Sequence, residues 1–320
     1  MKRYNVVGWY GRRNCGDDAL QLAMSKVVGG DLTFSTRPTK GDDPIILGGG
    51  DVIYPLYLDH IRKTGKRIKV LGAGIGYEEQ ATFLKGIADE VWLRNREDVE
   101  LARRAGVDAH YTPDLAFSLE VGSTPDLPIS KKKHLGVMVA DTINVTGSHR
   151  DARHHSYADY FSWELAESLR YLSEWYEIHF VPMSHYQYAY DIKMIYDIMS
   201  RIPGTTTPTI ISEHPLDPLS TLQVVSQLDL IVTMRFHGLI FATIAHTPFI
   251  NIGLSRKTAL FCREHGLSDL SLDPYSFEYT RFQEFVKHAE QDGVRERLQA
   301  VHEEKKTQLA EVKKHIQECW

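Results

Sequence analysis

The chain has 320 residues, a hydrophobic content of 42% and a formal net charge of −5 from 37 basic and 42 acidic side chains. Its length and composition are those of a globular protein of about two domains, and the acidic balance argues against a nucleic-acid-binding surface. Apolar runs are too short to cross a bilayer, the first residues lack the apolar core of a signal peptide, and the three widely spaced cysteines are typical of reduced thiols, so we expect a cytoplasmic protein.

Strand and helix patterns alternate along the first part of the chain. Strands are expected at 4–11, 43–53, 67–76, 90–95 and 109–119, and amphipathic helices at 17–28, 54–65, 78–89 and 96–106. This alternation predicts a parallel sheet that is covered on both faces. Several of the strands end in glycine, and the carboxyl ends of parallel strands share the sheet edge at which open α/β sheets bind ligands.

A proline-, serine- and lysine-rich segment then separates this part from a second alternation. Its strands are expected at 134–141, 176–184, 207–212, 228–234 and 248–254, and its helices at 157–175, 190–202, 217–227 and 238–246. We therefore predict an N-terminal Rossmann-like domain (1–125), a linker (126–133), a C-terminal Rossmann-like domain (134–276) and a charged helical segment (277–320). The two domains are expected to face a cleft, with the last helices packed across both.

Several motifs follow one another in a characteristic order. They are "GWYGRRNCGDDALQLA" (8–23), "LGGGDVI" (47–53), "GAGIG" (72–76), "RNREDVELARRAGVDAHYTPDLAF" (94–117) and "TMRFHGLIFATIAHTPFINIGLSRK" (233–257). Together they resemble the polysaccharide pyruvyl transferase family over residues 5–270. The resemblance implies a GT-B-like α/β fold and transfer of a pyruvyl group from phosphoenolpyruvate to two hydroxyls of a sugar or glycan, as a ketal, with release of phosphate. The sequence contains no tight carboxylate cluster, so we expect no metal, and we expect no cofactor.

This reaction needs an acid that protonates the methylene carbon of the donor. Histidine suits the task because its ordinary pKa lies near neutrality. His237 lies between the strand 228–234 and the helix 238–246, whose N-terminus offers N–H groups and partial positive charge, so His237 is the candidate general acid. Gly238 is expected to leave room for the donor to approach the backbone. A helix-capping or core role is the alternative for an isolated histidine.

The phosphate and carboxylate of the donor call for fixed cations. Arg235 closes a strand of the second domain, Lys257 follows the neighbouring strand, and Arg96 closes the strand 90–95 of the first domain. The resemblance implies donor binding at these three residues. Arg94 and Arg256 are close rivals, and a surface ion pair is the alternative for any one of them.

Acceptor-binding candidates come from polar loops at the strand ends. A triple glycine before Asp51 lets a sugar approach closely. Asp17 is either a helix cap or a ligand of acceptor hydroxyls, and Asp114 is either a base or a turn residue. The loop 182–191 combines His185, three tyrosines and Asp191, which suits a sugar ring, and the His-rich segment 148–160 is interpreted as a mobile rim. The predicted acceptor-binding residues are Asn14, Asp17, Gly49, Asp51, Asp114 and His185.

Two alternatives belong to other functional classes. The first is a GT-B glycosyltransferase with a nucleotide-sugar donor, for which Glu264 could bind the ribose. The second is an inactive family member that serves as a binding module or assembly subunit. The retained cations and histidine favour the active pyruvyl transferase. Its expected partners are phosphoenolpyruvate and a sugar or glycan, with peripheral membrane association if the acceptor is lipid-linked and without nucleic acid. The acceptor and the oligomeric state stay open.

Overall fold

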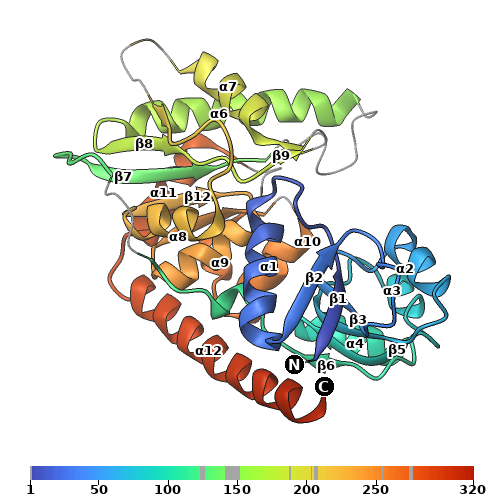
Figure 1. The fold of residues 1–320 in the computed structure, drawn as a ribbon. Coiled ribbons are helices and arrows are strands. Elements are labelled where there is room, and N and C mark those ends of the chain that lie inside the picture. Colours follow the sequence, from blue (N-terminus) through green and yellow to red (C-terminus); the bar gives the residue numbers. More distant parts are fainter. Residues whose placement is uncertain are drawn as a thin grey trace. The chain divides into compact units, whose positions relative to one another are not determined.

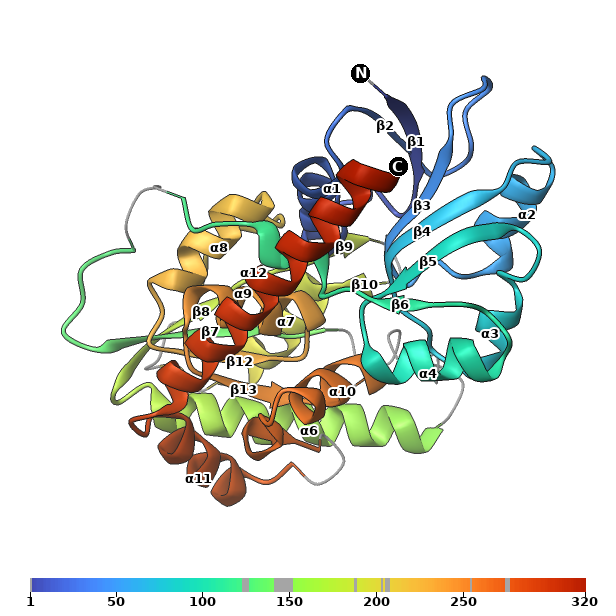
Figure 2. The ribbon, with the colours of Figure 1, turned by 90° about the horizontal axis from the view of Figure 1, so that it is seen from below.

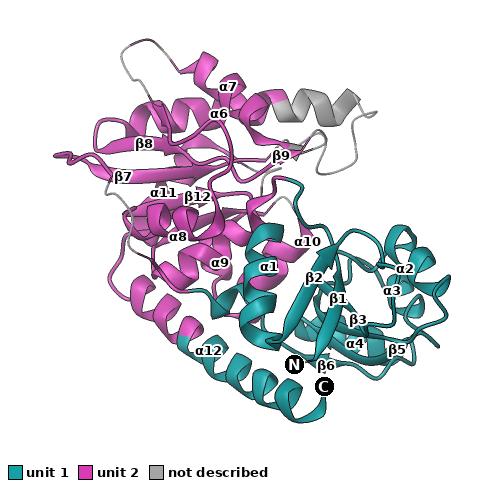
Figure 3. Cartoon of the chain, in the orientation of Figure 1, with its two compact units in different colours: residues 1–12, 17–119, 303–320 teal, residues 13–16, 120–302 magenta. Residues whose placement is uncertain are grey.

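The protein is represented by a computed structural model that describes residues 2–122, 127–140, 152–186, 189–202, 204, 208–253, 255–273 and 277–320, without the side chains of residues 152–158 and 189. The chain forms two compact units (Figure 3). Unit 1 comprises residues 1–12, 17–119 and 303–320, and unit 2 comprises residues 13–16 and 120–302. Each unit contains a six-stranded sheet, so the predicted α/β class with two parallel sheets is confirmed.

The sheet of unit 1 has the strand order β2-β1-β3-β4-β5-β6, with every neighbouring pair parallel. The strands are β1 (Arg3–Val7), β2 (Asp31–Ser35), β3 (Ile45–Gly50), β4 (Ile68–Ala73), β5 (Ala88–Leu93) and β6 (His110–Tyr111). The helices are α1 (Cys15–Val28), α2 (Pro55–Arg62), α3 (Glu78–Thr82) and α4 (Arg96–Arg104), with the 3₁₀ helix η1 (Leu115–Ser118) after β6.

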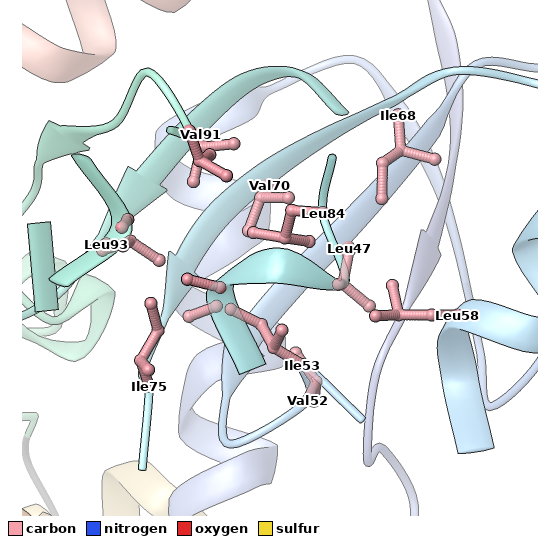
Figure 4. Close-up of a cluster of buried hydrophobic side chains, with 14 of the residues drawn as sticks. Leu47, Val52, Ile53, Leu58, Ile68, Val70, Ile75, Leu84, Val91 and Leu93 are labelled. Atoms are coloured by element: carbon pink, nitrogen blue, oxygen red, sulfur yellow. The ribbon is translucent and has the colours of Figure 1, made fainter. Parts of the chain in front are cut away.

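Buried aliphatic side chains hold this sheet against its helices. Figure 4 shows Leu47, Val70 and Val91 from three neighbouring strands beside Leu58 of α2 and Leu84, which follows α3. All five are at most 1% exposed. Burying one such side chain stabilises the fold by about 1.5–3 kcal/mol. The apolar runs that predicted the central strands therefore form the core of unit 1.

The edge strand β2 was missed by the sequence analysis. Its sequence DLTFS has alternately exposed and half-buried positions, and no residue of it is fully buried. A strand at a sheet edge pairs on one side alone and does not need a continuous apolar run. Hydrophobic patterning therefore gave no signal for this element.

The sheet of unit 2 has the strand order β11-β8-β7-β12-β13-β14 and is parallel throughout. Numbered in chain order, these strands follow the Rossmann arrangement 3-2-1-4-5-6, whose ligand-binding switch point lies between the first and fourth strands. In this unit the switch point lies between β7 and β12. The strands are β7 (Lys133–Met138), β8 (Tyr176–Phe180), β11 (Thr209–Ile210), β12 (Leu230–Thr233), β13 (Phe249–Ile252) and β14 (Ser271–Leu272).

Helices cover both faces of this second sheet, with α6 and α7 on one face and α8 and α9 on the other (Figure 1). Right-handed crossovers between parallel strands require this alternation of faces. Short strands β9 (His185–Tyr186) and β10 (Ala189–Tyr190) form a separate antiparallel pair. The helices are α6 (Ala152–Leu172), α7 (Asp191–Arg201), α8 (Pro218–Ser226), α9 (Phe236–Ala245), α10 (Arg256–Glu264), η2 (Ser268–Leu270), α11 (Tyr279–Ala289) and α12 (Val294–Cys319).

The C-terminal end of α12 belongs to unit 1, where it surrounds one carboxylate. Glu90 accepts hydrogen bonds from the ring nitrogens of Trp92, His315 and Trp320, each at 2.7 Å, and Lys69 lies 3.3 Å away. Burial raises the pKa of Glu90, but these hydrogen bonds outweigh it and the pKa lies below its ordinary value.

Among the helices of the described residues, each is too short or too polar to span a membrane.

Candidate active site

A cavity of about 80 Å³ lies at the carboxyl edge of the unit 2 sheet. Its described lining residues follow four neighbouring strands, β8, β7, β12 and β13, or come from the segment before α1. They are Asn14, Gly16, Ala140, Met183, Met234, Arg235, Phe236, His237, Ser255 and Lys257. Four residues predicted from the sequence, Asn14, Arg235, His237 and Lys257, therefore line one cavity that adjoins the switch point between β7 and β12.

Arg235 occupies the N-cap position of α9, and a buried carboxylate holds its side chain. Its guanidinium forms an ion pair with Asp191, which is fully buried. The other oxygen of Asp191 accepts the backbone N–H groups of Met183 and Ser184, both at 2.9 Å. Asp191 thus anchors both Arg235 and the loop after β8. Our interpretation of Asp191 as part of a sugar-binding loop was wrong, because this carboxylate is inside the protein.

His237 is the second residue of α9, and its half-buried ring packs closely against Gly16. A Cβ atom added to Gly16 would lie 2.1 Å from His237 Nδ1, far inside any normal contact. The rings of Phe236 and Phe241 flank the imidazole at centroid distances of 5.4 and 6.4 Å. The imidazole can therefore occupy this position because Gly16 has no side chain.

Gly238 has a packing role that the sequence analysis did not anticipate. A Cβ atom at this position would lie 2.3 Å from Thr233 Oγ1 and 2.9 Å from Met138 Sδ. The position that a Cβ atom of Gly238 would occupy faces β12 and the end of β7. The space that we expected there for a ligand is therefore occupied by protein. Donor binding by the backbone of Gly238 stays a prediction.

Lys257 reaches the cavity from a helix instead of from a strand end. It is the second residue of α10, a helix that the sequence analysis missed, and Ser255 occupies the N-cap position. The first turns of α9 and α10 thus both adjoin the cavity. N–H groups in a first helical turn lack acceptors within the helix and carry partial positive charge. The described lining residues include two permanent cations and a histidine but no carboxylate, which favours an anionic ligand.

The segment before α1 is attached to unit 2 by backbone hydrogen bonds. The N–H of Cys15 donates to the carbonyl of Met183, and the N–H of His185 donates to the carbonyl of Arg13, both at 2.9 Å. These bonds bring Asn14 to the cavity wall. Because this loop follows the first predicted strand, the sequence places it in the first domain, whereas the contacts group Arg13–Gly16 with unit 2.

A second group of predicted residues comes together in unit 1. Arg94 lies 2.6 Å from Asp51 and 3.3 Å from Asp114, and its side chain is 2% exposed. Burial lowers the pKa of Arg94, but the charges of Asp51 and Asp114 outweigh it and raise the pKa. Arg94, the rival of Arg96, is therefore the arginine that joins the predicted acceptor carboxylates.

Arg96 lies elsewhere in unit 1. Its guanidinium stacks over the Tyr111 ring at 4.4 Å and lies 4.0 Å from Glu304, so donor binding at Arg96 stays a prediction. Asp114, for which we considered a base or a turn residue, accepts the N–H of Ala116 at 3.0 Å and caps η1.

The triple glycine of β3 lies against the start of α1. Gly49 and Gly50 have positive φ angles of 60° and 78°, a backbone region that favours glycine. A Cβ atom on Gly50 would lie 3.2 Å from the Asp17 carboxylate. Gly49 therefore lies at the carboxyl end of β3, two residues before Asp51, and Asp17 lies beside Gly50, the residue that precedes Asp51.

His185 is separate from the residues that line the cavity. Its ring packs against Tyr190 and His214 at centroid distances of 4.5 and 4.6 Å, and its Nδ1 lies 3.1 Å from that of His214. Burial and the charges of His214 and Arg13 lower the pKa of His185. Residues 148–151 of the predicted rim lie outside the described part of the chain. The side chains of residues 152–158 are not described either.

A metal centre is not indicated by the part of the chain that is described. No three His, Cys, Asp or Glu side chains among those residues lie close enough to bind one ion together.

Solved structures share this fold. S. aureus MnaA, solved with UDP, superimposes with a TM-score of 0.60 at 8% identity, covering 93% of this chain and 90% of that one. The Methanocaldococcus jannaschii UDP-GlcNAc 2-epimerase gives 0.59 at 12% identity, with coverages of 92% and 94%. An apo structure of OtsA gives 0.59 at 12% identity, with coverages of 100% and 98%. At such identities the likeness shows the fold alone, and the predicted GT-B-like class is confirmed.

A search among curated protein sequences finds no match. The sequence model that describes polysaccharide pyruvyl transferases matches residues 5–256, which is most of the chain and includes every residue that we singled out for the site except Lys257 and Glu264. The chain therefore belongs to the polysaccharide pyruvyl transferase family.

Proposed function

We propose that the protein transfers a pyruvyl group from phosphoenolpyruvate to two hydroxyls of a glycan. The observation that carries the proposal is the cationic cavity of unit 2, where Arg235, His237 and Lys257 meet at the N-termini of two helices. Membership of the polysaccharide pyruvyl transferase family supports a transferase that acts on a polysaccharide.

The cavity has the charge that the donor requires, and it is small. Arg235 and Lys257 offer charge-assisted hydrogen bonds to its phosphate and carboxylate, and the first turns of α9 and α10 add backbone donors. The volume of about 80 Å³ is small beside the 300–1,000 Å³ of pockets that enclose larger ligands. This size favours phosphoenolpyruvate over a nucleotide sugar.

The chemistry then proceeds through an electrophilic carbon. His237 donates a proton to the methylene carbon of phosphoenolpyruvate, so that C2 becomes oxocarbenium-like and an acceptor hydroxyl adds to it. The bond between C2 and the phosphate oxygen breaks, and a second hydroxyl closes the ketal. Of the two hydroxyl protons, one restores His237 and the other leaves with phosphate. Fixed positive charge around the leaving phosphate stabilises the transition state.

On the acceptor side, we propose Asp51 as the carboxylate that receives a hydrogen bond from a sugar hydroxyl. Its side chain is 43% exposed, whereas Asp114 is 3% exposed and already caps η1. Asp17 and Gly49 adjoin the same strand end and complete this proposed surface. Asn14 and His185, which belong to unit 2, are proposed separately as acceptor contacts. A lipid-linked acceptor would bring the protein to a membrane surface.

Ligand-dependent stability tests the choice of donor. Phosphoenolpyruvate at 100 times its Kd should raise the free energy of unfolding by about 2.7 kcal/mol, since it binds the folded state alone. Thermal unfolding with phosphoenolpyruvate is compared with UDP-, GDP- and CMP-sugars, and the ketal is detected by phosphate release that depends on a glycan. The second candidate is a glycosyltransferase with a nucleotide-sugar donor, for which the UDP bound to S. aureus MnaA, a protein of the same fold, is the supporting observation. Stabilisation by a nucleotide sugar and none by phosphoenolpyruvate would establish that candidate instead.

A further inference from the structure

A second and larger cavity, of about 510 Å³, lies at the opposite edge of the unit 2 sheet. It is bounded by the start of β7, the end of α6, the start of β8 and α11, and Figure 2 shows α11 beside the end of α6. The two cavities share no residue among those described, and β7, with six residues, separates their ends of the sheet by about 20 Å. The lining residues are Lys131, Lys132, Lys133, Tyr171, Leu172, Glu174, Trp175, Tyr176, Gln283, Val286, Lys287 and Glu290.

Aromatic rings form the apolar part of this second cavity. Trp175 is 48% exposed although it is a large hydrophobic side chain. Its ring packs on Tyr171 at a centroid distance of 4.9 Å, and Tyr171 packs on Tyr279 at 5.5 Å. Tyr176 is buried and donates its hydroxyl to Glu290 at 2.5 Å. Trp175 therefore lines the cavity with a partly exposed ring that packs on Tyr171.

Lysines give this cavity a positive balance in a chain whose formal net charge is −5. Four lysines line it against two glutamates. Lys133 pairs with Glu290, and Lys132 donates to the Ser173 carbonyl at 2.6 Å. Within the described residues, neither Lys131 nor Lys287 forms a salt bridge. Positive charge thus gathers beside an exposed aromatic face.

We infer that this cavity binds a segment of an acidic glycan. The apolar face of a pyranose ring packs on Trp175, carboxylates of the glycan meet Lys131 and Lys287, and Glu174 and Gln283 accept hydrogen bonds from hydroxyls. The volume lies within the range of about 300–1,000 Å³ that is typical of ligand pockets, so it holds a few sugar units.

This inference deepens the proposed function, on which it rests for its glycan. A pyruvyl ketal keeps the carboxylate of the donor, so every round of transfer adds a negative charge to the polymer. A cationic site about 20 Å from the catalytic cavity would therefore retain glycan that is already modified. Such a second contact raises the effective concentration of the remaining acceptor sites.

Binding of an acidic tetrasaccharide by the full chain tests the inference. The probes are tetragalacturonate, its methyl ester, which has the same sugars without the charges, and UMP. Calorimetry at low salt measures the binding of each probe, and phosphoenolpyruvate is not needed for this measurement. We expect the acid to bind about tenfold more tightly than the ester, because two charge-assisted contacts are worth at least that factor.

Variants locate the binding. Trp175→Ala should weaken binding of the acid about tenfold through the lost stacking. The double substitution Lys131→Gln and Lys287→Gln should weaken the acid and leave the ester unchanged. Trp163→Ala is the matched control, because Trp163 is 50% exposed on α6 and lies outside the cavity lining. If Trp175→Ala fails to fold, the lysine variant decides the question.

The inference is overturned if tetragalacturonate does not bind, if it binds equally to the lysine variant, or if UMP binds more tightly with the same dependence on Trp175. These results are independent of catalysis. A protein that binds the acid through Trp175 but transfers no pyruvyl group would refute the proposed function and keep the site. Transfer with unaltered binding in both variants would keep the proposed function and remove the site.

Discussion

The contact between Gly16 and His237 allows a substitution that moves the proposed acid and leaves its chemical identity intact. In Gly16→Ala, the new Cβ atom starts 2.1 Å from His237 Nδ1, whereas an ordinary contact begins at 3.4 Å. The imidazole must therefore shift by about 1.3 Å, and a misplacement of about 1 Å can cost a factor of about 100 in rate. The obstacle is the movable end of a side chain, so we expect turnover to fall about 100-fold with little loss of stability.

Phosphate release in the presence of a glycan acceptor measures this turnover, and thermal unfolding measures stability. Gly122→Ala is the control, because a Cβ atom at Gly122 meets no atom within 4 Å. Gly238→Ala should behave differently, since its Cβ atom would strike Thr233 and Met138 in the packed interior and lower the melting temperature. A folded Gly16→Ala protein with wild-type turnover would show that the position of His237 is unimportant, and the assignment of the acid would fail.

His237→Gln should keep donor affinity within a few-fold but lower turnover about 10²–10⁴-fold, as measured by calorimetry and phosphate release, and wild-type turnover would place the acid elsewhere. Lys257→Ala should weaken donor binding by about 1.5–3 kcal/mol in calorimetry, and unaltered affinity would move the anion site. Glu90→Gln should lower the free energy of unfolding by about 1–3 kcal/mol at pH 7. Because the folded-state pKa of Glu90 is lowered, its contribution is complete above the ordinary glutamate pKa and is lost as the pH falls through the lowered value. Denaturant titrations of both proteins at a series of pH values from 7 downwards test this, and a difference that does not shrink as the pH falls contradicts it.

The parallel architecture was predictable because burial on both faces makes central strands continuously apolar. Strands such as β3 and β12, with sequences IILGGG and LIVT, are buried at every position. Elements that lie at a sheet edge or carry charge gave weaker signals. The edge strand β2 contains no fully buried residue, and α10 has charged residues at both ends. Their formation depends on neighbours that are distant in the sequence.

Residues of the candidate site were predictable where they directly follow a strand, because the order of the strands along the chain then determines the sheet edge at which they lie. Arg235 and His237 follow β12, and Lys257 follows β13, so the parallel pairing of these strands brings all three to one sheet edge. Partners across the fold were not predictable in this way. Asp191 pairs with Arg235 from 44 residues away, and periodicity gives no information about such a contact.

The buried Asp191 changes how the role of Arg235 has to be tested. Arg235→Ala would leave a fully buried carboxylate without its cation, which typically costs about 3–5 kcal/mol of stability. A loss of donor binding in that variant would therefore report a disturbed fold as readily as a missing ligand contact. Arg235→Lys keeps the charge beside Asp191 but replaces the planar fork that binds phosphate or carboxylate through two hydrogen bonds. We expect this variant to fold with a melting temperature close to that of the wild type and to bind phosphoenolpyruvate about tenfold more weakly. Equal affinity in calorimetry would mean that Arg235 serves Asp191 and α9 alone, and that Lys257 and the helix N-termini bind the donor.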